Sequence, residues 1–281
     1  MFTNNWHTYV LLSTEAWNPS FVKMKINRDR AEMTDGAAAV GAAIYTKQVL
    51  SAYDFFVLGF SNTLIWKCPS RLILDFYNQH VSGKHLDLGV GTGYFLDKCR
   101  FPSSAPIIAL MDLNPNSLQV TSERLRRYSP MTSLANVLEP IRIEHVQREP
   151  RSRPQRNVEL AQGSCRSCHR HSLESPGFDS IGLNYLFHCL PGTMQSKGVV
   201  FSNLKPLLND GGVVFGTTIL GQDIKRGFLA KTLMNIYNSK GIFSNKNDTL
   251  SELESLLKQN FRDHSVQVVG CVAFFVGRMS L

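Results

Sequence analysis

Charge and cysteine are scarce in this sequence of 281 residues, and it has no long apolar run. Charged residues make up 19% of the chain, below the roughly one quarter that is usual for globular domains. Hydrophobic residues make up 43%, which suffices for a core and excludes a mostly disordered chain, a collagen and a coiled coil. Six cysteines are too few for a disulfide scaffold in a chain of this length, so they predict a reducing compartment.

No targeting or membrane-spanning segment is visible in the sequence. Near the N-terminus the longest apolar run is Val10 to Leu12, and no basic segment precedes it, which is unlike a signal peptide. No stretch approaches the roughly 18 consecutive apolar residues of a transmembrane helix. We therefore predict a cytoplasmic protein without a membrane partner.

Strands and helices alternate from residue 37 onward, after an irregular arm at 1–36. Short apolar runs at 85–88, 107–111, 181–186 and 213–220 predict strands, and β-rich stretches at 266–269 and 271–276 end the chain. Helical patterns cover 37–68 and 115–128, the second with Asn114 as the expected N-cap before Pro115, and a further segment opened by the capping box of Thr249 and Glu252. This alternation predicts an α/β fold with a mostly parallel sheet.

The segment 141–177 interrupts this pattern. It contains seven Arg and four Glu, no Lys and no usable periodicity. Because structureless loops of this length are uncommon inside a compact domain, we predict a disordered insertion in a domain spanning 37–281. The composition fits a true insertion and a gene-model artefact equally well, and sequencing of the transcript distinguishes them.

A glycine-rich turn follows the first predicted strand, with the pattern Gly89-Val90-Gly91-Thr92-Gly93. Small residues let the backbone approach a nucleotide at the N-terminus of the following helix. The pattern is neither the dinucleotide fingerprint, since Tyr94 stands where its third glycine is expected, nor a phosphate loop. Asp112 ends the next strand, 19 residues after Gly93, where a carboxylate can accept hydrogen bonds from both ribose hydroxyls.

These motifs resemble those of the class I S-adenosylmethionine-dependent methyltransferases. HLDLGVGTGYFLDKC is similar to the first motif of that family, IIALMDLNPNSL to the second and FDSIGLNYLFHCLPG to the fourth. LKPLLNDGGVVFGTTIL is similar to the strand that follows, and YDFFVLGFSNTLIWK to the N-terminal helix of small-molecule enzymes of the quinone-biosynthesis type. The resemblance covers roughly 37–140 and 178–278. It implies a Rossmann-like sheet of seven strands with an antiparallel last strand, helices on both faces, and S-adenosyl-L-methionine as cofactor.

The resemblance also implies which residues contact the cofactor. Asp87 is expected near the amino group of the cofactor, although it could simply cap the glycine loop. Asn136 stands where the family commonly has an Asp that meets the adenine. Asn184 and Tyr185, after the fourth-motif strand, are as consistent with ordinary loop polarity. The predicted cofactor residues are Tyr45, Asp87, Gly89, Gly91, Gly93, Asp112, Leu113, Asn136, Val137, Asn184 and Tyr185.

Catalytic candidates are fewer, because the sulfonium cofactor already carries an activated methyl group and a base is needed only for a protonated acceptor. His188 is the best general-base candidate, since an ordinary histidine titrates in the useful range, but a structural histidine is the commoner case. Tyr53 is a second candidate, and core packing is an equal alternative for it. An apolar stripe at helical spacing fits core packing better than an acceptor pocket; its members are Phe228, Leu229, Leu233, Ile236 and Tyr237.

A cysteine–histidine cluster lies inside the segment 141–177. Cys165, Cys168 and His171 have zinc-like spacing, with His169 beside them. A structural zinc site needs four ligands, and no second pair follows at the required distance. An incidental cluster is therefore the better interpretation, and we predict no metal.

Three functions fit the sequence. The first is methyl transfer by in-line displacement to a small apolar or aromatic metabolite. The second is RNA methylation, suggested by the net charge of +8, although the fourth motif lacks the Asn/Asp-Pro-Pro-aromatic tetrad used on exocyclic base amines. The third is a non-catalytic cofactor-binding regulator. The sequence leaves the acceptor and the oligomeric state open.

Overall fold

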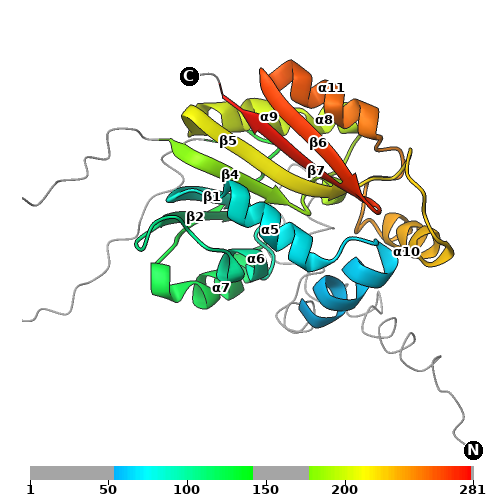
Figure 1. Cartoon of the computed structure of the whole chain (residues 1–281), viewed down its shortest axis with the longest axis horizontal. Coiled ribbons are helices and arrows are strands. Elements are labelled where there is room, and N and C mark those ends of the chain that lie inside the picture. The colour runs from blue at the N-terminus through cyan, green and yellow to red at the C-terminus, as the bar shows by residue number, and fades with distance from the viewer. Residues whose placement is uncertain (1–53, 142–176, 280–281) are drawn as a thin grey trace, which may run out of the picture.

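A computed structural model of the chain describes residues 54–141 and 177–279. Within them, seven strands form one sheet in the order β3-β2-β1-β4-β5-β7-β6. Strands β1 to β5 pair in parallel, whereas β7 runs antiparallel to both β5 and β6. The predicted α/β fold with an antiparallel last strand is thereby confirmed (Figure 1). The strands are β1 Lys84–Leu88, β2 Ile107–Asp112, β3 Met131–Leu134, β4 Phe178–Asn184, β5 Leu208–Ile219, β6 Asp263–Val269 and β7 Val272–Arg278.

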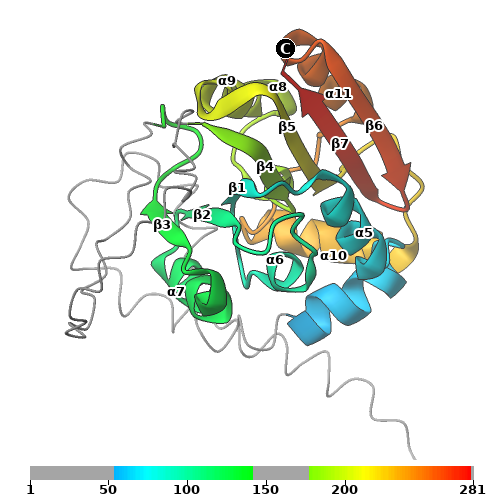
Figure 2. The same ribbon diagram turned by 60° about the vertical axis from the view of Figure 1, so that its left-hand side comes forward.

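Helices cover both faces of the sheet (Figure 2). One face carries α5, α6, α7 and α10, and the other carries α8, α9 and α11. The described helices are the π-helix η1 Asp54–Ile65, α5 Ser70–His80, α6 Tyr94–Lys98, α7 Pro115–Arg124, α8 Met194–Lys197, α9 Val199–Leu204, α10 Phe228–Ser239 and α11 Leu250–Asn260, with short 3-10 turns η2 Arg126–Tyr128, η4 Phe187–Cys189 and η5 Lys205–Leu207.

The helix starts predicted from capping residues are confirmed. The side chain of Asn114 accepts a hydrogen bond from the backbone N–H of Asn116 at 2.8 Å and opens α7. Thr249 and Glu252 form the reciprocal capping box that opens α11. The leucines expected on one face of α11 are buried against the sheet.

Two local predictions are wrong. The strand predicted at 213–220 begins earlier, at Leu208, and its register with β4 shifts between Phe178 and Ser180. Three of the five members of the apolar stripe on α10 are not core: Phe228, Leu229 and Ile236 are 81%, 62% and 39% exposed. The other two, Leu233 and Tyr237, are partly buried against the core, and the fully buried members of the helix are Ala230 and Met234.

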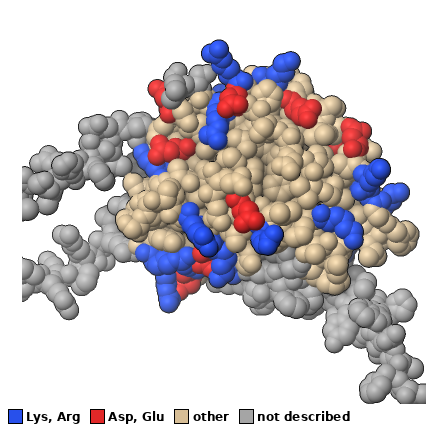
Figure 3. All heavy atoms as spheres, viewed as in Figure 1, with Lys and Arg blue, Asp and Glu red and all other residues tan. Residues whose placement is uncertain are grey.

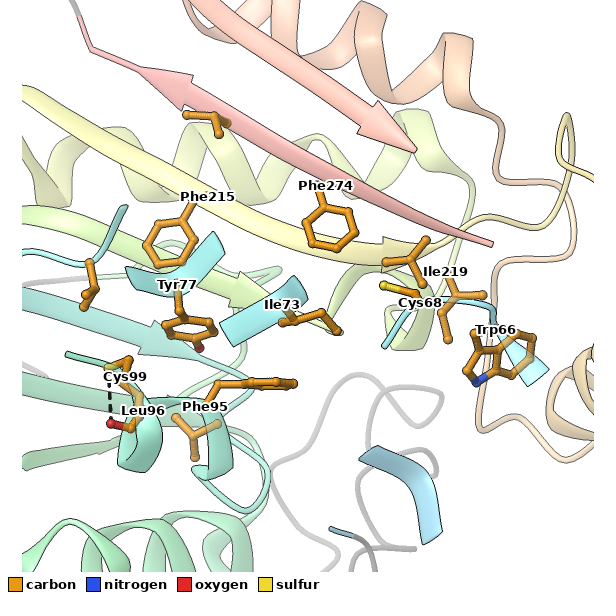
Figure 4. Packing of buried hydrophobic residues seen from close by; sticks show 14 of the residues in the cluster. Trp66, Cys68, Ile73, Tyr77, Phe95, Leu96, Cys99, Phe215, Ile219 and Phe274 are labelled. Atoms are coloured by element: carbon orange, nitrogen blue, oxygen red, sulfur yellow. Dashed lines mark hydrogen bonds between the residues drawn. The ribbon is translucent and has the colours of Figure 1, made fainter. Parts of the chain in front are cut away.

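Helix α5 lies inside a stretch for which the sequence predicts no element. It buries Ile73 and Tyr77, four residues apart, on one face. Figure 4 shows these side chains beside Phe215 of β5 and Phe274 of β7, and the rings of Tyr77 and Phe215 are 5.2 Å apart. This packing fixes the distance of α5 from the sheet, and it places the Tyr77 hydroxyl beside Asp87 on β1. The arm at 1–36 and the interior of the segment 141–177 lie outside the described residues.

Candidate active site

One pocket opens at the carboxyl ends of β1, β2 and β4, the edge at which α/β sheets place ligands. Every predicted cofactor residue that the structure describes lines it. These ten residues are Asp87, Gly89, Gly91, Gly93, Asp112, Leu113, Asn136, Val137, Asn184 and Tyr185. The structure thus brings together residues spread over about a hundred positions of the chain. Tyr45 and Tyr53 lie outside the described residues.

The glycine loop forms one wall of this pocket. Gly91 has φ +53°, and a Cβ added there would meet nothing within 4 Å, so it would project into open space. Gly93 has φ +69°, and a Cβ there would lie 2.6 Å from Thr121 Cγ2 on α7. Gly91 therefore keeps the backbone accessible to a ligand, while Gly93 permits the close packing of α7.

Asp112 is held at the end of β2 by backbone donors. Its Oδ1 accepts a hydrogen bond from Asn114 N–H at 2.8 Å, and its Oδ2 accepts a longer one from Gly91 N–H at 3.4 Å. Burial raises the pKa of this carboxyl to about 6, against the opposing effect of the backbone hydrogen bonds. Asp112 is therefore a largely ionised and desolvated acceptor at neutral pH.

Asp87 lies deeper in the pocket, at the end of β1, and is 4% exposed. Its Oδ1 accepts a hydrogen bond from the Tyr77 hydroxyl at 2.8 Å. Burial, followed by the charge of Asp87, raises the pKa of Tyr77 well above its ordinary value, and the nearby amide of Asn184 opposes this only in part. Tyr77 therefore stays a donor that fixes the orientation of the carboxylate.

His85, also on β1, lies near the same carboxylate without a hydrogen bond to it. Its Nε2 lies 3.7 Å from Asp87 Oδ1, and its Nδ1 lies 2.8 Å from Ser180 Oγ on β4. The side chains of His85 and Ser180 are fully buried. Neither Tyr77 nor His85 is among the residues predicted from the sequence. The spacing of Ile73 and Tyr77 could have revealed α5, whereas no sequence signal places a tyrosine beside Asp87.

Two amides complete the polar lining. Asn184 Oδ1 accepts a hydrogen bond from Thr217 Oγ1 at 3.2 Å, whereas its buried Nδ2 has no hydrogen bond of regular geometry among the described residues. Asn136 Oδ1 accepts from Leu138 N–H at 3.1 Å, which orders the turn after β3. Asn203 of α9 also holds this turn, because its Nδ2 donates to Val137 O at 3.0 Å.

His188 lies beneath the pocket, in η4, and is not among the residues that line it. Its ring is 3% exposed and packs 4.5 Å from the ring of Phe243. Its Nδ1 accepts a hydrogen bond from Ile219 N–H at 3.3 Å, and burial lowers its pKa to about 3. These contacts favour the structural alternative, and catalysis by His188 stays a prediction without support from the geometry.

The charge of the lining is one-sided. Among the described lining residues the ionisable side chains are two carboxylates, three tyrosines and one cysteine, with no Lys, Arg or His: Asp87, Asp112, Tyr77, Tyr94, Tyr185 and Cys189. A pyrophosphate would find no cationic partner there, whereas a ligand bearing positive groups would meet both carboxylates. The described residues contain no cluster of metal-ligating side chains, and Cys165, Cys168, His169 and His171 lie outside them.

Comparison with known proteins identifies the class. The chain is 34% identical to a demethylluteothin O-methyltransferase of Streptomyces thioluteus, over 84% of this chain and 89% of that protein. It is also 34% identical to the O-methyltransferase NEC2 of Pyricularia oryzae, over 90% and 94%. A third relative, the physcion biosynthesis cluster O-methyltransferase of Aspergillus chevalieri, is 31% identical over 84% and 93%. No family model matches the sequence.

Solved structures show the same fold at low sequence identity. An O-methyltransferase family protein of Burkholderia thailandensis superposes with a TM-score of 0.56 at 12% identity, covering 97% of this chain and 70% of that one. The DhpI–SAH complex gives 0.55 at 11% identity, covering 88% and 99%. Together with the relatives, they make the protein an S-adenosylmethionine-dependent methyltransferase. The chain belongs to the class I family of these enzymes that act on small molecules. Among the described helices, none is long and apolar enough to cross a bilayer.

Proposed function

We propose that the pocket holds S-adenosyl-L-methionine and that the enzyme methylates an oxygen of a small aromatic or apolar metabolite. The observation that carries the proposal is the convergence of ten predicted residues on one pocket with two carboxylates and no basic side chain among its described lining. A sulfonium and an ammonium group suit that lining. The O-methyltransferase names of the relatives support oxygen as the methylated atom.

Different residues of the pocket would bind different parts of the cofactor. Asp112 would accept from the ribose hydroxyls, with Leu113 beside it, and Asp87, oriented by Tyr77, would accept from the ammonium group. Asn136 and Val137 would contact the adenine. The wall formed by Gly89, Gly91 and Gly93 would lie along the cofactor, and Asn184 and Tyr185 would close the deep end. Tyr45 remains a predicted contact from outside the described residues.

The cofactor supplies an activated methyl group, so the protein's part is to position the acceptor and to exclude water. Asp87 and Asp112 would serve that purpose by holding the ammonium group and the ribose of the cofactor in place. A phenol or enol acceptor must lose its proton. The two carboxylates of the described lining, Asp87 and Asp112, are assigned to the cofactor, so we propose that the base is Tyr53 or that the proton leaves to solvent.

The acceptor side is apolar. Helices η1 and α10 lie toward the end of the molecule at which β4 and β5 end, and both views place them near each other (Figures 1 and 2). They expose Phe60 and Leu64 on η1, and Phe228, Leu229 and Ile236 on α10. Exposed apolar groups of this kind suit an apolar substrate.

Nucleic acid is a poorer fit as substrate. Figure 3 shows one face of the described residues, on which basic and acidic side chains are interspersed and form no continuous basic stripe. The fourth motif continues as Asn184-Tyr185-Leu186-Phe187, without the proline pair of enzymes that act on base amines. We also propose a cytoplasmic location, which the four free cysteines among the described residues support. For the domain organisation we still propose an N-terminal arm at 1–36 and a methyltransferase domain at 37–281 with an insertion at 141–177.

Cofactor binding is the first test. S-adenosyl-L-methionine and its demethylated product, S-adenosylhomocysteine, are each expected to raise the melting temperature, by several degrees at about 100 times the Kd. NAD at the same concentration is expected to leave it unchanged, because its pyrophosphate lacks a cationic partner in the lining. The measurement is a thermal-shift titration. Stabilisation by NAD, or by none of the three, contradicts the proposal.

The raised pKa of Asp112 predicts a pH-dependent affinity. Below about pH 6 this carboxyl takes up a proton and loses acceptor capacity for the ribose hydroxyls. The Kd for S-adenosylhomocysteine is therefore expected to increase about tenfold from pH 7.5 to pH 5. At the lower pH, binding of one ligand should release close to one proton. Calorimetric titrations across this range measure it. Asp112→Asn is the control, and a pH profile identical in both proteins assigns the titration to another group.

A further inference from the structure

Tyr185 has a backbone conformation that its side chain disfavours. It follows the last residue of β4 with φ +57°, in the left-handed region where bulky residues are rare. Two contacts hold Tyr185 in this conformation. Its N–H donates to Thr217 O at 2.8 Å, and its ring lies 5.5 Å from that of His188. Strained residues of this kind cluster at sites where the side chain must be aimed.

The Tyr185 hydroxyl contacts helix η1. It donates to Asn62 Oδ1 at 3.1 Å, across 123 positions of the chain. Asn62 is fully buried, and its Nδ2 donates to Ser70 Oγ at 2.8 Å, at the start of α5. Both polar atoms of the Asn62 side chain are therefore used, one toward α5 and one toward Tyr185.

These contacts connect two parts of the site. The residue Tyr185 lines the cofactor pocket, while its hydroxyl reaches the helix that carries the exposed Phe60 and Leu64 on the acceptor side. Helix η1 is a π-helix, an uncommon form that recurs at functional sites. Trp66, directly after η1, is tied to the turn between β6 and β7, because its O accepts a hydrogen bond from Cys271 N–H at 2.8 Å.

We propose that Tyr185 is a positioning residue that transmits occupancy of the cofactor pocket to helix η1 through its hydrogen bond to Asn62. The inference rests on the proposed placement of the cofactor in this pocket. A ligand against Tyr185 limits the motion of its strained backbone and ring. A bound cofactor would thereby strengthen the hold of the hydroxyl on Asn62, and η1 would be held more firmly over the acceptor side. The enzyme would thereby order its acceptor wall after the methyl donor is bound.

The two hydrogen bonds of Asn62 provide a matched pair of variants. Tyr185→Phe removes the bond that carries the proposed coupling and keeps the ring, whereas Ser70→Ala removes the bond that ties Asn62 to α5. Amide hydrogen exchange of residues 54–65 is measured in the full chain, without ligand and with S-adenosylhomocysteine at a concentration that saturates each protein. Exchange in β7 serves as the reference for the intact fold.

In the unmodified protein and in Ser70→Ala, the ligand is expected to slow exchange in η1 about tenfold, and in Tyr185→Phe less than about twofold. A purely structural hydroxyl would instead speed exchange equally with and without ligand. Equal protection in Tyr185→Phe and the unmodified protein overturns the proposal, as does a bound ligand that leaves η1 unprotected in the unmodified protein. Failure of the ligand to bind at all contradicts the proposed function itself.

Discussion

Asp248→Ala is expected to lower the free energy of unfolding by about 3–5 kcal/mol, because it leaves a buried lysine without its counter-ion. Asp248 Oδ2 lies 2.6 Å from Lys197 Nζ, and the two side chains are 2% and 0% exposed. Burial lowers the pKa of Lys197, and the Asp248 carboxylate opposes that shift. Without Asp248, the ammonium must be desolvated unpaired or lose its proton.

The change is measured by urea unfolding at pH 7. A matched control is Asp263→Ala, which breaks an exposed pair with Arg278 at 3.7 Å. That substitution is expected to cost less than about 1 kcal/mol, as exposed pairs do. Replacing both Lys197 and Asp248 by apolar residues is expected to recover much of the loss, because no charge remains buried. A loss no larger than that of the control would show that the pair is not desolvated.

The pair also supports the active site from below. Lys197 Nζ donates a second hydrogen bond to Ser244 O at 2.7 Å, and Ser244 N–H donates to His188 O at 2.8 Å. In the same loop, Asn245 Nδ2 donates to Ile219 O at 2.7 Å. The loop between α10 and α11 thus fixes the end of β5 and the turn that carries His188. These contacts favour the structural alternative for His188.

The glycine turn and the strand-end carboxylate of the pocket were predictable from sequence, because local chemistry determines them. A glycine that must reach positive φ, a carboxylate at a strand end and an asparagine before proline each leave a short-range signal. Gly91, Asp112 and Asn114 carry those signals, and the parallel sheet brings them together without further information. The fold followed from the same alternation of strands and helices.

The residues that support the pocket from α5 and η1 were not predictable, because they depend on contacts between distant segments. Nothing local to Tyr77 shows that α5 packs across β5 and directs the hydroxyl to Asp87. The pairing of Asn62 with Tyr185 spans 123 positions. The exposure of Phe228 illustrates the converse error: its spacing on α10 predicts burial, but the helix turns Ala230 and Met234 to the core. Periodicity identifies a helix more reliably than it identifies which side is covered.

Asp112→Asn is expected to weaken binding of S-adenosylhomocysteine about 100-fold at pH 7.5. Two hydrogen bonds from ribose hydroxyls to a charged acceptor would be replaced by at most one to a neutral amide, and bonds to charged groups contribute roughly 1.5–3 kcal/mol each. Asparagine keeps the shape and an oxygen for the Asn114 N–H. The control is Asp179→Asn, an exposed carboxylate near the opposite end of β4, for which the Kd should not change.

The same substitution is expected to stabilise the ligand-free protein, by about 1–3 kcal/mol at pH 7.5. The folded-state pKa of Asp112 is raised from 3.8 to about 6, so the fold disfavours its ionised form. That cost is absent below pH 3.8, grows between pH 3.8 and 6, and is fully present above pH 6. Asparagine removes it, so the gain in urea unfolding should shrink as the pH falls toward 4. Loss of affinity with a gain in stability identifies a carboxylate kept for its ligand. A variant that loses both would instead show that Asp112 supports the fold.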